Sequence, residues 1–290
     1  MITIVGGTGR LGRLVAARLV ADGHPVRLVG RHIREGLPDG TEFVAADVRR
    51  PESLAAAVAG SDVVVSAVQG VDPTYDESPA EVDRDGNLAL IRAARGVGAD
   101  IVLLSSIDAS PEHPIELMRM KAAAEQELHA GEPDRVDWTV VRPTAYVELW
   151  AEVMRQTAGR KGVPKVLGKG VNPVNFVAVA DVAAAVHRAV VDPGLRGLVI
   201  DVGGPENLTM TELARLVTGQ PKVVHVPRAA LRTMSLLMAP VRPAQARLAR
   251  MALQMDTIRM AFDPTSSRGA HPWLPCTPVA EALPSGSTVG

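Results

Sequence analysis

Apolar and polar residues alternate in two distinct ways along the first half of the chain. Short apolar runs, mostly of β-branched residues, are separated by longer segments in which apolar residues recur at helical spacing. The runs predict buried strands and the longer segments predict amphipathic helices. The expected strands are Ile2 to Val5, Val26 to Val29, Phe43 to Ala46, Val63 to Val65 and Ile101 to Leu104. The expected helices are Leu11 to Ala21, Glu52 to Ala59 and Pro79 to Val97.

The order of these elements predicts the fold class. Strands that alternate with helices indicate βαβ units and a parallel sheet with helices on both faces. Trp138 to Val141 and Leu198 to Asp201 are expected to add two further strands. Asp181 is expected to cap a helix from Val182 to Val191. The segment Thr209-Met210-Thr211-Glu212 matches a capping box.

The segment from Pro227 to Phe262 has a different character, because it lacks strand patterns and is rich in Met, Leu, Ala and Arg. One interpretation is a pair of amphipathic helices, broken around Pro240 and Pro243, whose arginines face water. The other is a substrate lid with an adaptable apolar surface, since methionines fill irregular pockets. Its methionines would be Met234, Met238, Met251 and Met255. The tail after Pro264 is expected to be irregular.

Composition restricts the functional classes. The 290 residues are 47% hydrophobic, 22% charged and only 3% aromatic, with a net charge of -1. A nucleic-acid partner is not expected, because there is no basic surplus and little aromatic surface for stacking. No apolar run reaches the ~20 residues that span a bilayer, and no signal peptide is seen, so no membrane partner and a cytoplasmic location are expected. The single cysteine, Cys276, cannot form an internal disulfide, and no metal site is expected.

The strongest chemical signal is a glycine-rich loop directly after the first expected strand. Its sequence, Gly6-Gly7-Thr8-Gly9-Arg10-Leu11-Gly12, opens a helix. In this context Gly6 permits a tight turn, Gly9 lets the backbone approach a pyrophosphate, and Gly12 lets helix and strand pack closely. The helix N-terminus then offers free N–H groups to phosphates. The loop predicts a dinucleotide site, and the alternative is a glycine-rich turn without a ligand.

The end of the second strand bears on the choice between NAD and NADP. NAD-specific folds usually place an acid there to bind the ribose hydroxyls. Here Gly30 occupies that position and Arg31 follows. A guanidinium pairs with a 2′-phosphate, so NADP(H) is preferred and NAD(H) is the second choice. Arg10 offers another positive contact, and the alternative for Arg31 is a solvated loop arginine.

Other candidate cofactor-binding residues follow the later strands, where ligands of open α/β sheets gather. Asp47 is placed to accept a hydrogen bond from the adenine amino group, with the Val48 N–H beside it. The alternative for Asp47 is a helix or turn cap before Pro51. The further candidates after the fourth and fifth strands are Ala67, Val68, Gln69, Ser105 and Ser106.

The ordered motifs resemble the atypical short-chain dehydrogenase/reductases, in particular the NmrA-like group. The resemblance covers about residues 1–220. It rests on the glycine loop, Ala46-Asp47-Val48, Leu104-Ser105-Ser106, Lys121-Ala122-Ala123-Ala124-Glu125, Trp138-Thr139-Val140-Val141-Arg142-Pro143-Thr144, Phe176 to Ala183 and Val202-Gly203-Gly204-Pro205-Glu206.

This resemblance implies a fold and a domain organisation for the chain. The expected fold is α/β, a Rossmann-type doubly wound parallel sheet with a smaller, mostly helical C-terminal substrate domain. Residues 1–145 would form the NAD(P)-binding domain, to which 176–203 return, and 146–175 and 204–290 would form the substrate-binding region. By the same resemblance, the nicotinamide would lie near Ser105, Lys121 and the segment Pro143-Thr144-Ala145-Tyr146.

One departure from the family pattern affects the expected chemistry. Typical short-chain reductases carry a Tyr proton donor four residues before the Lys, but here Leu117 precedes Lys121. Three interpretations of Lys121 stay open: a general acid, a ligand of the nicotinamide ribose, or a surface salt bridge with Glu125. Tyr146 and His113 are alternative proton donors.

Two functions are therefore expected. The first is an NADPH-dependent reductase that acts on an apolar or aromatic small molecule, such as a quinone, an enone or an aromatic secondary metabolite, as a monomer or homodimer. The second is a non-catalytic NADP(H) sensor of the NmrA type, which the missing Tyr leaves open, whereas the Met-rich helical segment favours the enzyme.

Overall fold

The computed structural model describes residues 1–70, 77–130, 136–159 and 162–283. The chain divides into two compact units. The first unit comprises Met1–Arg142 and Val182–Asp201, and the second comprises Pro143–Asp181 and Val202–Gly290. The chain was expected to return to the first unit at residue 176. It returns at Val182 instead, because the strand that precedes it pairs within the second unit.

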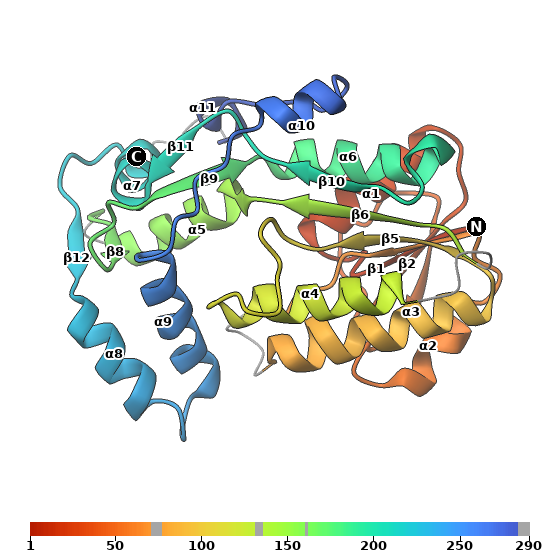
Figure 1. Cartoon of the computed structure of the whole chain (residues 1–290), viewed down its shortest axis with the longest axis horizontal. Coiled ribbons are helices and arrows are strands. Elements are labelled where there is room, and N and C mark those ends of the chain that lie inside the picture. Colours follow the sequence, from red (N-terminus) through yellow and green to blue (C-terminus); the bar gives the residue numbers. More distant parts are fainter. Residues whose placement is uncertain (71–76, 131–135, 160–161, 284–290) are drawn as a thin grey trace. The chain divides into compact units, whose positions relative to one another are not determined.

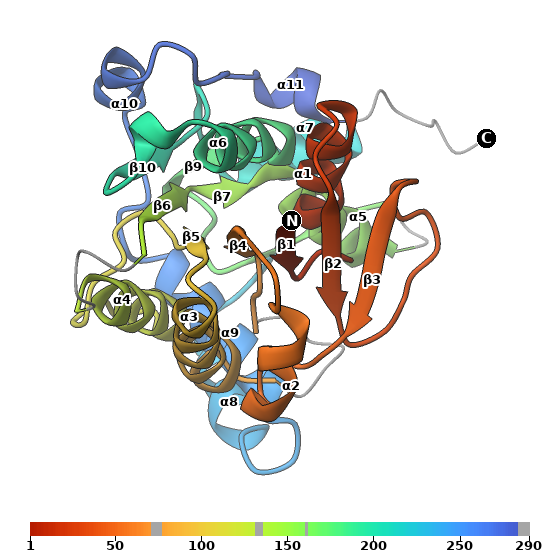
Figure 2. The same cartoon turned by 90° about the vertical axis from the view of Figure 1, so that its right-hand side faces the viewer.

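The first unit is built on a seven-stranded parallel sheet with the order β10-β6-β5-β4-β1-β2-β3 (Figure 2). Its strands are β1 Ile2–Val5, β2 Val26–Gly30, β3 Thr41–Ala45, β4 Val63–Ser66, β5 Asp100–Leu104, β6 Trp138–Pro143 and β10 Val199–Val202. All seven expected strands are confirmed to within about two residues. The chain moves outward from β1 through β2 to β3, then restarts on the other side with β4. Such a reversal creates a crevice at the carboxyl ends of β1 and β4, where ligands of this fold bind.

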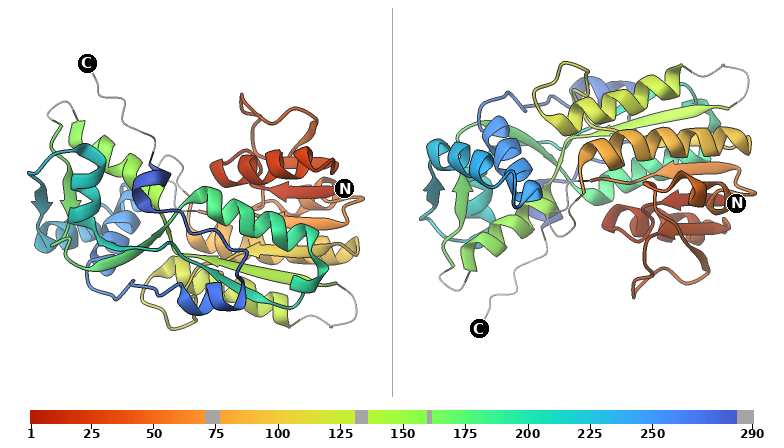
Figure 3. Two further views of the ribbon diagram at one scale, coloured as in Figure 1. Left: turned by 90° about the horizontal axis from the view of Figure 1, so that it is seen from above. Right: turned by 90° about the horizontal axis from the view of Figure 1, so that it is seen from below.

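Helices cover both faces of this sheet (Figures 2 and 3). One face carries α1, Arg10–Ala21, and the part of α6, Val179–Val191, that belongs to the first unit. The other carries α2, Pro51–Ala57, α3, Asn87–Gly96, and α4, Glu116–His129. A short 3₁₀ turn, Pro193–Leu195, leads into β10. The apolar core on the second face joins strand residues Val64 and Leu103 to helix residues Leu54, Leu90 and Ile91.

The segment expected as one helix from Pro79 to Val97 is divided in two. Its first part is a π-helix, η1, Ala80–Gly86, and its second part is α3. The widened turn is accompanied by a side-chain hydrogen bond, because the Asn87 amide donates to the Asp83 carbonyl at 2.8 Å. Single π turns inside helices are frequent at functional sites.

The second unit contains short strands and several helices (Figure 1). Its two small sheets have the orders β11-β9-β7 and β12-β8. The strands are β7 Ala145–Tyr146, β8 Lys165–Leu167, β9 Pro173–Val177, β11 Asn207–Thr209 and β12 Val224–Val226. The helices are α5 Val147–Ala158, α7 Met210–Thr218, α8 Arg228–Leu237, α9 Pro243–Met255, α10 Thr265–Ala270 and α11 Val279–Ala282. Phe176 and Leu213 lie at the centre of its core.

Several local predictions for this unit have clear outcomes. The capping box of Thr209 and Glu212 is confirmed at the start of α7. The helix pair in the Arg-rich segment is also confirmed, since α8 and α9 form an antiparallel hairpin (Figure 1). The Asp181 cap was wrong, because α6 begins at Val179 and the buried Asp181 carboxylate instead accepts hydrogen bonds from Thr277. The tail is not wholly irregular, since it contains α10 and α11.

Within the described ranges, no helix is long and apolar enough to cross a membrane.

Candidate functional site

The glycine loop joins β1 to α1 by a turn that only small residues permit. Gly6 has a φ of +85°, and a Cβ built on it would lie 2.5 Å from the Ala67 carbonyl oxygen. A Cβ on Gly12 would lie 2.6 Å from both the Gly6 oxygen and the Gly7 Cα. These contacts are to backbone and cannot relax, so both positions require glycine. The expected roles of Gly6 in the turn and Gly12 in close packing are therefore confirmed.

The N-terminus of α1 is left open toward this loop. Gly9 is the N-cap residue, and no side chain caps the helix. A Cβ on Gly9 would meet only the Gly6 oxygen, at 3.2 Å, so the space beside it is open. The first N–H groups of a helix have no partner inside it and carry a partial positive charge. This end of α1 therefore fits the pyrophosphate of a dinucleotide, and Arg10 and Leu11 supply two of its first N–H groups.

The loop after β4 lies against the glycine loop, as expected for a switch-point crevice. The Ala67 N–H donates to the Val5 carbonyl at 2.8 Å, which continues the pairing of β1 with β4. The close approach of Ala67 to Gly6 brings the two loops together. Gln69 is exposed, whereas Val68 is half-buried and its carbonyl is used by Lys121.

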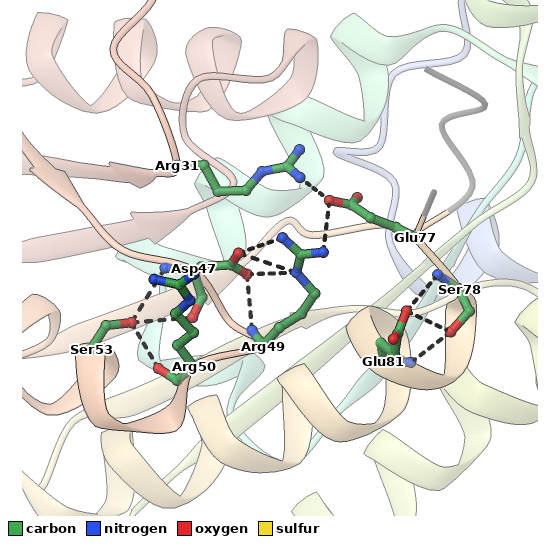
Figure 4. Close-up of polar contacts among 8 residues, drawn as sticks. All are labelled: Arg31, Asp47, Arg49, Arg50, Ser53, Glu77, Ser78 and Glu81. Carbon is green, nitrogen blue, oxygen red and sulfur yellow. Dashed lines mark hydrogen bonds and ion pairs between the residues drawn. The ribbon is translucent and has the colours of Figure 1, made fainter. Parts of the chain in front are cut away.

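Arg31, directly after β2, is engaged by a carboxylate that the sequence did not single out. Its guanidinium forms an ion pair with Glu77, whose side chain is only 6% exposed (Figure 4). Arg49 lies 3.7 Å from the same Glu77 oxygen. The solvated-loop interpretation of Arg31 is wrong, because its side chain is 30% exposed and paired.

The missing acid at the end of β2 has a packing explanation. A Cβ on Gly30 would lie 2.9 Å from Thr8 Oγ1 and 3.1 Å from Thr8 Cγ2. Thr8 is itself buried in the glycine loop. A larger residue at position 30 would therefore have to push Thr8 out of its place.

Asp47, which follows β3, closes the turn that one of its two interpretations expected. Its carboxylate accepts the Arg49 backbone N–H at 3.0 Å, which closes a turn, and it forms a bidentate pair with the Arg49 guanidinium (Figure 4). The hydrogen-bonded Arg49 side chain lowers the pKa of Asp47 below its usual value. The turn is confirmed, and binding of the adenine amino group stays a prediction. The neighbouring Val48 is buried.

Lys121 is the centre of a buried polar cluster. Its Nζ lies 2.9 Å from Asp83 Oδ1 and donates to the carbonyl oxygens of Val68 and Leu104, each at 3.0 Å. The Lys121 side chain is 5% exposed and that of Asp83 is fully buried. The two carbonyls accept two of the three N–H groups of the ammonium, whereas Asp83 Oδ1 pairs with its charge but has no hydrogen-bond partner among the described residues. The general-acid role and the ribose-binding role of Lys121 both stay predictions.

The third interpretation of Lys121, a surface pair with Glu125, was wrong. Glu125 is buried and forms a bidentate pair with Arg142, including a bond from Arg142 Nε at 2.9 Å. On α4 the two side chains therefore turn to different partners, Glu125 toward β6 and Lys121 toward η1.

The polar cluster continues from Asp83 to the end of β4. The second Asp83 oxygen accepts the Gly70 N–H at 2.8 Å. Asn87, also fully buried, is hydrogen-bonded to the Ser66 hydroxyl. The cluster therefore fixes the ends of β4 and β5 against η1 and α4.

Ser105 and Ser106 follow β5 beside this cluster. The Ser105 N–H donates to the Val141 carbonyl at 2.9 Å, which continues the pairing of β5 with β6. Its hydroxyl is buried and has no hydrogen-bond partner among the residues that the structure describes. A buried polar group without a partner in the protein is unusual, so this hydroxyl fits a ligand contact. Ser106 is half-buried.

The remaining candidates belong to the second unit or are held by local bonds. The Thr144 hydroxyl is bonded to the buried Asn175 amide oxygen at 2.9 Å, and Pro143 is buried. Burial, with a contribution from Glu148, raises the pKa of Tyr146 well above its usual value, so this phenol stays protonated at neutral pH. Burial lowers the pKa of His113, whose Nδ1 accepts the Ile115 N–H at 3.1 Å.

The residues that sequence reasoning missed are Asp83, Asn87, Arg49 and Glu77. A signal existed for the first two, since they fall four residues apart on the apolar stripe that continues with Leu90, Ile91 and Ala94. Arg49 and Glu77 gave no comparable signal, because charged loop residues are normally solvated.

No group of three or more His, Cys, Asp or Glu side chains that would hold a metal ion occurs within the described residues.

The parallel sheet, the glycine loop and the uncapped α1 define a dinucleotide-binding domain of the Rossmann type. The chain belongs to the NAD(P)H-binding family of atypical short-chain dehydrogenase/reductases, whose model, described as NAD(P)H-binding, matches residues 6–193.

Several relatives of this chain are NAD(P)H-dependent reductases. The chain is 29% identical to an NAD(P)H azoreductase of Xenophilus azovorans over 222 residues, 74% of this chain and 71% of that protein. It is 31% identical to a (4-alkanoyl-5-oxo-2,5-dihydrofuran-3-yl)methyl phosphate reductase of Streptomyces griseus subsp. griseus over 227 residues, 73% and 71% of the two chains. The fold is shared with an NADPH-dependent quinone oxidoreductase of Escherichia coli, at a TM-score of 0.75, 21% identity and coverage of 97% and 98%.

The buried pair of Lys121 and Asp83 generates a prediction about stability. Lys121→Met leaves a buried carboxylate without its cation, which should reduce the free energy of unfolding by about 3–5 kcal/mol. Asp83→Asn should have a similar effect, and the double variant should lose much less than the sum of the two. Urea unfolding followed by circular dichroism measures all three.

Arg92→Met is the matched control, because Arg92 forms an exposed pair with Glu127 between α3 and α4. This change should cost under about 1 kcal/mol. Equal losses for Lys121→Met and Arg92→Met would contradict the structural role of the buried pair.

Proposed function

We propose that the chain is an NADPH-dependent reductase of an apolar small molecule, such as a quinone, an enone or an aromatic secondary metabolite. The observation that carries this proposal is the open N-terminus of α1 behind the Gly6 turn, at the switch point of a parallel sheet. Two of its relatives are named as reductases, and the solved structure that shares its fold is an NADPH-dependent quinone oxidoreductase.

The residues at the crevice fit the parts of a dinucleotide in order. The glycine loop and α1 would hold the pyrophosphate, Asp47 and Val48 the adenine, and Arg31 a 2′-phosphate. The unpartnered Ser105 hydroxyl would contact the nicotinamide end. When bound, the reduced nicotinamide supplies a hydride.

The proton that completes such a reduction needs a donor from the chain or from water. Lys121 offers a buried ammonium that pairs with Asp83 and donates to two carbonyl oxygens. Tyr146 keeps its proton because burial raises its pKa. His113 is disfavoured, because its lowered pKa leaves it neutral at pH 7. We propose Lys121 as the donor and Tyr146 as the alternative.

A second candidate function is an NADP(H) sensor without catalysis. Leu117, which is buried, stands where the family places its Tyr, and the buried Lys121 ammonium is paired with the buried Asp83. Both features are what a protein that binds the cofactor without turning it over would show.

A turnover assay distinguishes the two functions. Purified protein should oxidise NADPH, followed by the absorbance of the reduced nicotinamide, when supplied with a panel of quinones, enones and azo dyes. The control is the purified protein with NADPH and no added substrate. Tight NADPH binding with no oxidation across the whole panel would contradict the reductase and favour the sensor.

The cofactor preference is a separate prediction. NADPH should bind more tightly than NADH, because a guanidinium forms charge-assisted hydrogen bonds to the 2′-phosphate worth about 1.5–3 kcal/mol each. Arg31→Ala should therefore weaken NADPH binding by about tenfold or more and leave NADH binding nearly unchanged. Isothermal titration calorimetry measures both. Equal affinities of the wild-type protein for the two cofactors would refute the preference.

The hairpin of α8 and α9 is proposed to contribute the apolar part of the substrate site. Met234 on α8 is 36% exposed, whereas Met255 on α9 is buried. If α8 contacts substrate, Met234→Ala should raise KM for the substrate several-fold while NADPH affinity stays the same. Thr233→Ala, at the neighbouring exposed position of α8, is the control. Unchanged KM values for Met234→Ala across the active substrates would end the lid interpretation.

A further inference from the structure

Two guanidinium groups and one buried carboxylate meet at the carboxyl ends of β2 and β3. Arg31 follows β2 and Arg49 lies just beyond β3, and both approach the same oxygen of Glu77 (Figure 4). Glu77 is buried, while the two arginines are partly exposed. Arg49 also pairs with Asp47, so the two arginine charges are balanced by the two carboxylates of Glu77 and Asp47.

An anion that binds to these arginines meets a carboxylate that is already there. The 2′-phosphate of NADP(H) would bind to the same two guanidinium groups that now pair with Glu77. Two anions at such a short distance repel strongly in a partly buried site. The phosphate therefore has to displace the Glu77 carboxylate, and the free energy of breaking its ion pair is subtracted from the affinity. A ribose 2′-hydroxyl carries no charge and has no such conflict, since a carboxylate at the end of β2 is the usual acceptor for it.

We propose that Glu77 is a specificity-determining residue of this site. Its carboxylate competes with the 2′-phosphate of NADP(H) for Arg31 and Arg49. This competition reduces the affinity for NADP(H) relative to the affinity for NAD(H). Gly30 leaves the end of β2 without the usual acid, and Glu77 brings a carboxylate there from a different part of the chain. The inference rests on the proposed function, in which Arg31 binds the 2′-phosphate.

The backbone of Arg31 and the side chain of Arg49 have supports other than Glu77. The backbone of Arg31 continues from β2, whose last residue, Gly30, is paired in register with Ala45 of β3. Arg49 is held by Asp47 through bonds of 2.6 to 3.1 Å from its side chain and one from its backbone. The departure of the Glu77 carboxylate would therefore leave the Arg31 backbone and the Arg49 guanidinium in place.

Glu77 is held near the arginines by its neighbours in the chain. Ser78 accepts and donates hydrogen bonds with Glu81 at the start of η1, at distances of 3.0 to 3.2 Å. This box fixes the backbone immediately after Glu77 (Figure 4). These bonds involve Ser78 and Glu81 and not the Glu77 side chain, so displacement of the Glu77 carboxylate by a ligand would leave them intact.

The experiment compares adenosine 2′,5′-bisphosphate with adenosine 5′-monophosphate, which differ only in the 2′-phosphate. Binding to the wild-type protein and to Glu77→Gln is measured by calorimetry. The substitution removes the competing charge and keeps the size of the side chain. The bisphosphate should bind about tenfold more tightly to Glu77→Gln than to wild type, with less than about a twofold change for the monophosphate. NADPH and NADH should follow the same pattern.

Two further variants keep the result interpretable. Glu42→Gln removes an exposed carboxylate that pairs with Arg27 on the same sheet, and should change neither affinity. Arg31→Gln combined with Glu77→Gln should lose most of the gain, because the released guanidinium is then absent. Thermal unfolding of each variant checks that the fold is retained; if Glu77→Gln fails to fold, Glu77→Asp, which withdraws the carboxylate by one methylene, should give a smaller gain in the same direction.

The outcomes separate this inference from the proposed function. If wild type discriminates in favour of the bisphosphate and Glu77→Gln does not increase the discrimination, Glu77 only positions the arginines and the inference is overturned, while the cofactor proposal stands. If wild type does not discriminate and Glu77→Gln does, the inference is supported and the wild-type preference for NADPH is refuted. No discrimination in either protein overturns both.

Discussion

The pairing of a buried ammonium with a buried carboxylate, Lys121 with Asp83, is the interaction on which the rest of the site depends. Through carbonyl and N–H contacts it joins the segments after β4 and β5 to η1 and α4, and so sets the loops that form the crevice. Removal of either partner from a low-dielectric site leaves an uncompensated charge, so both charges must be kept or lost together. The lysine that the family resemblance made a candidate for catalysis is therefore part of the framework.

The fold was largely predictable, because its parallel sheet is buried on both faces and its strands therefore appear as continuous apolar runs. The second unit was harder. Its strands are two to five residues long, and β7 or β12 cannot be told from loop by periodicity. The division of Pro79 to Val97 into η1 and α3 depends on a hydrogen bond from the Asn87 side chain, which no periodic pattern contains. Asp181 looked like a cap because its later partner, Thr277, is distant in sequence.

The site divides in the same way. The glycine loop, Asp47, Ser105 and Lys121 were found because each directly follows a strand or matches a motif with a fixed spacing. Arg49 and Glu77 were not, because their importance comes from convergence in space and not from local sequence. The sequence therefore indicated the candidates that follow strands or match motifs, but not the residues that neutralise their charges. Arg31 is therefore not a solvated loop arginine, because its charge is paired with the Glu77 carboxylate.

The contact between Gly30 and Thr8 has a consequence for how this protein can be re-engineered or can diverge. The usual route to an NAD-specific enzyme is a single change that places an acid at the end of β2. Here that change would drive a carboxylate stem into the glycine loop, since a Cβ at position 30 already lies 2.9 Å from Thr8 Oγ1. The loss in pyrophosphate binding would then offset the gain at the ribose. An evolutionary path toward NAD is therefore expected to leave Gly30 in place and to proceed by substitutions at other positions.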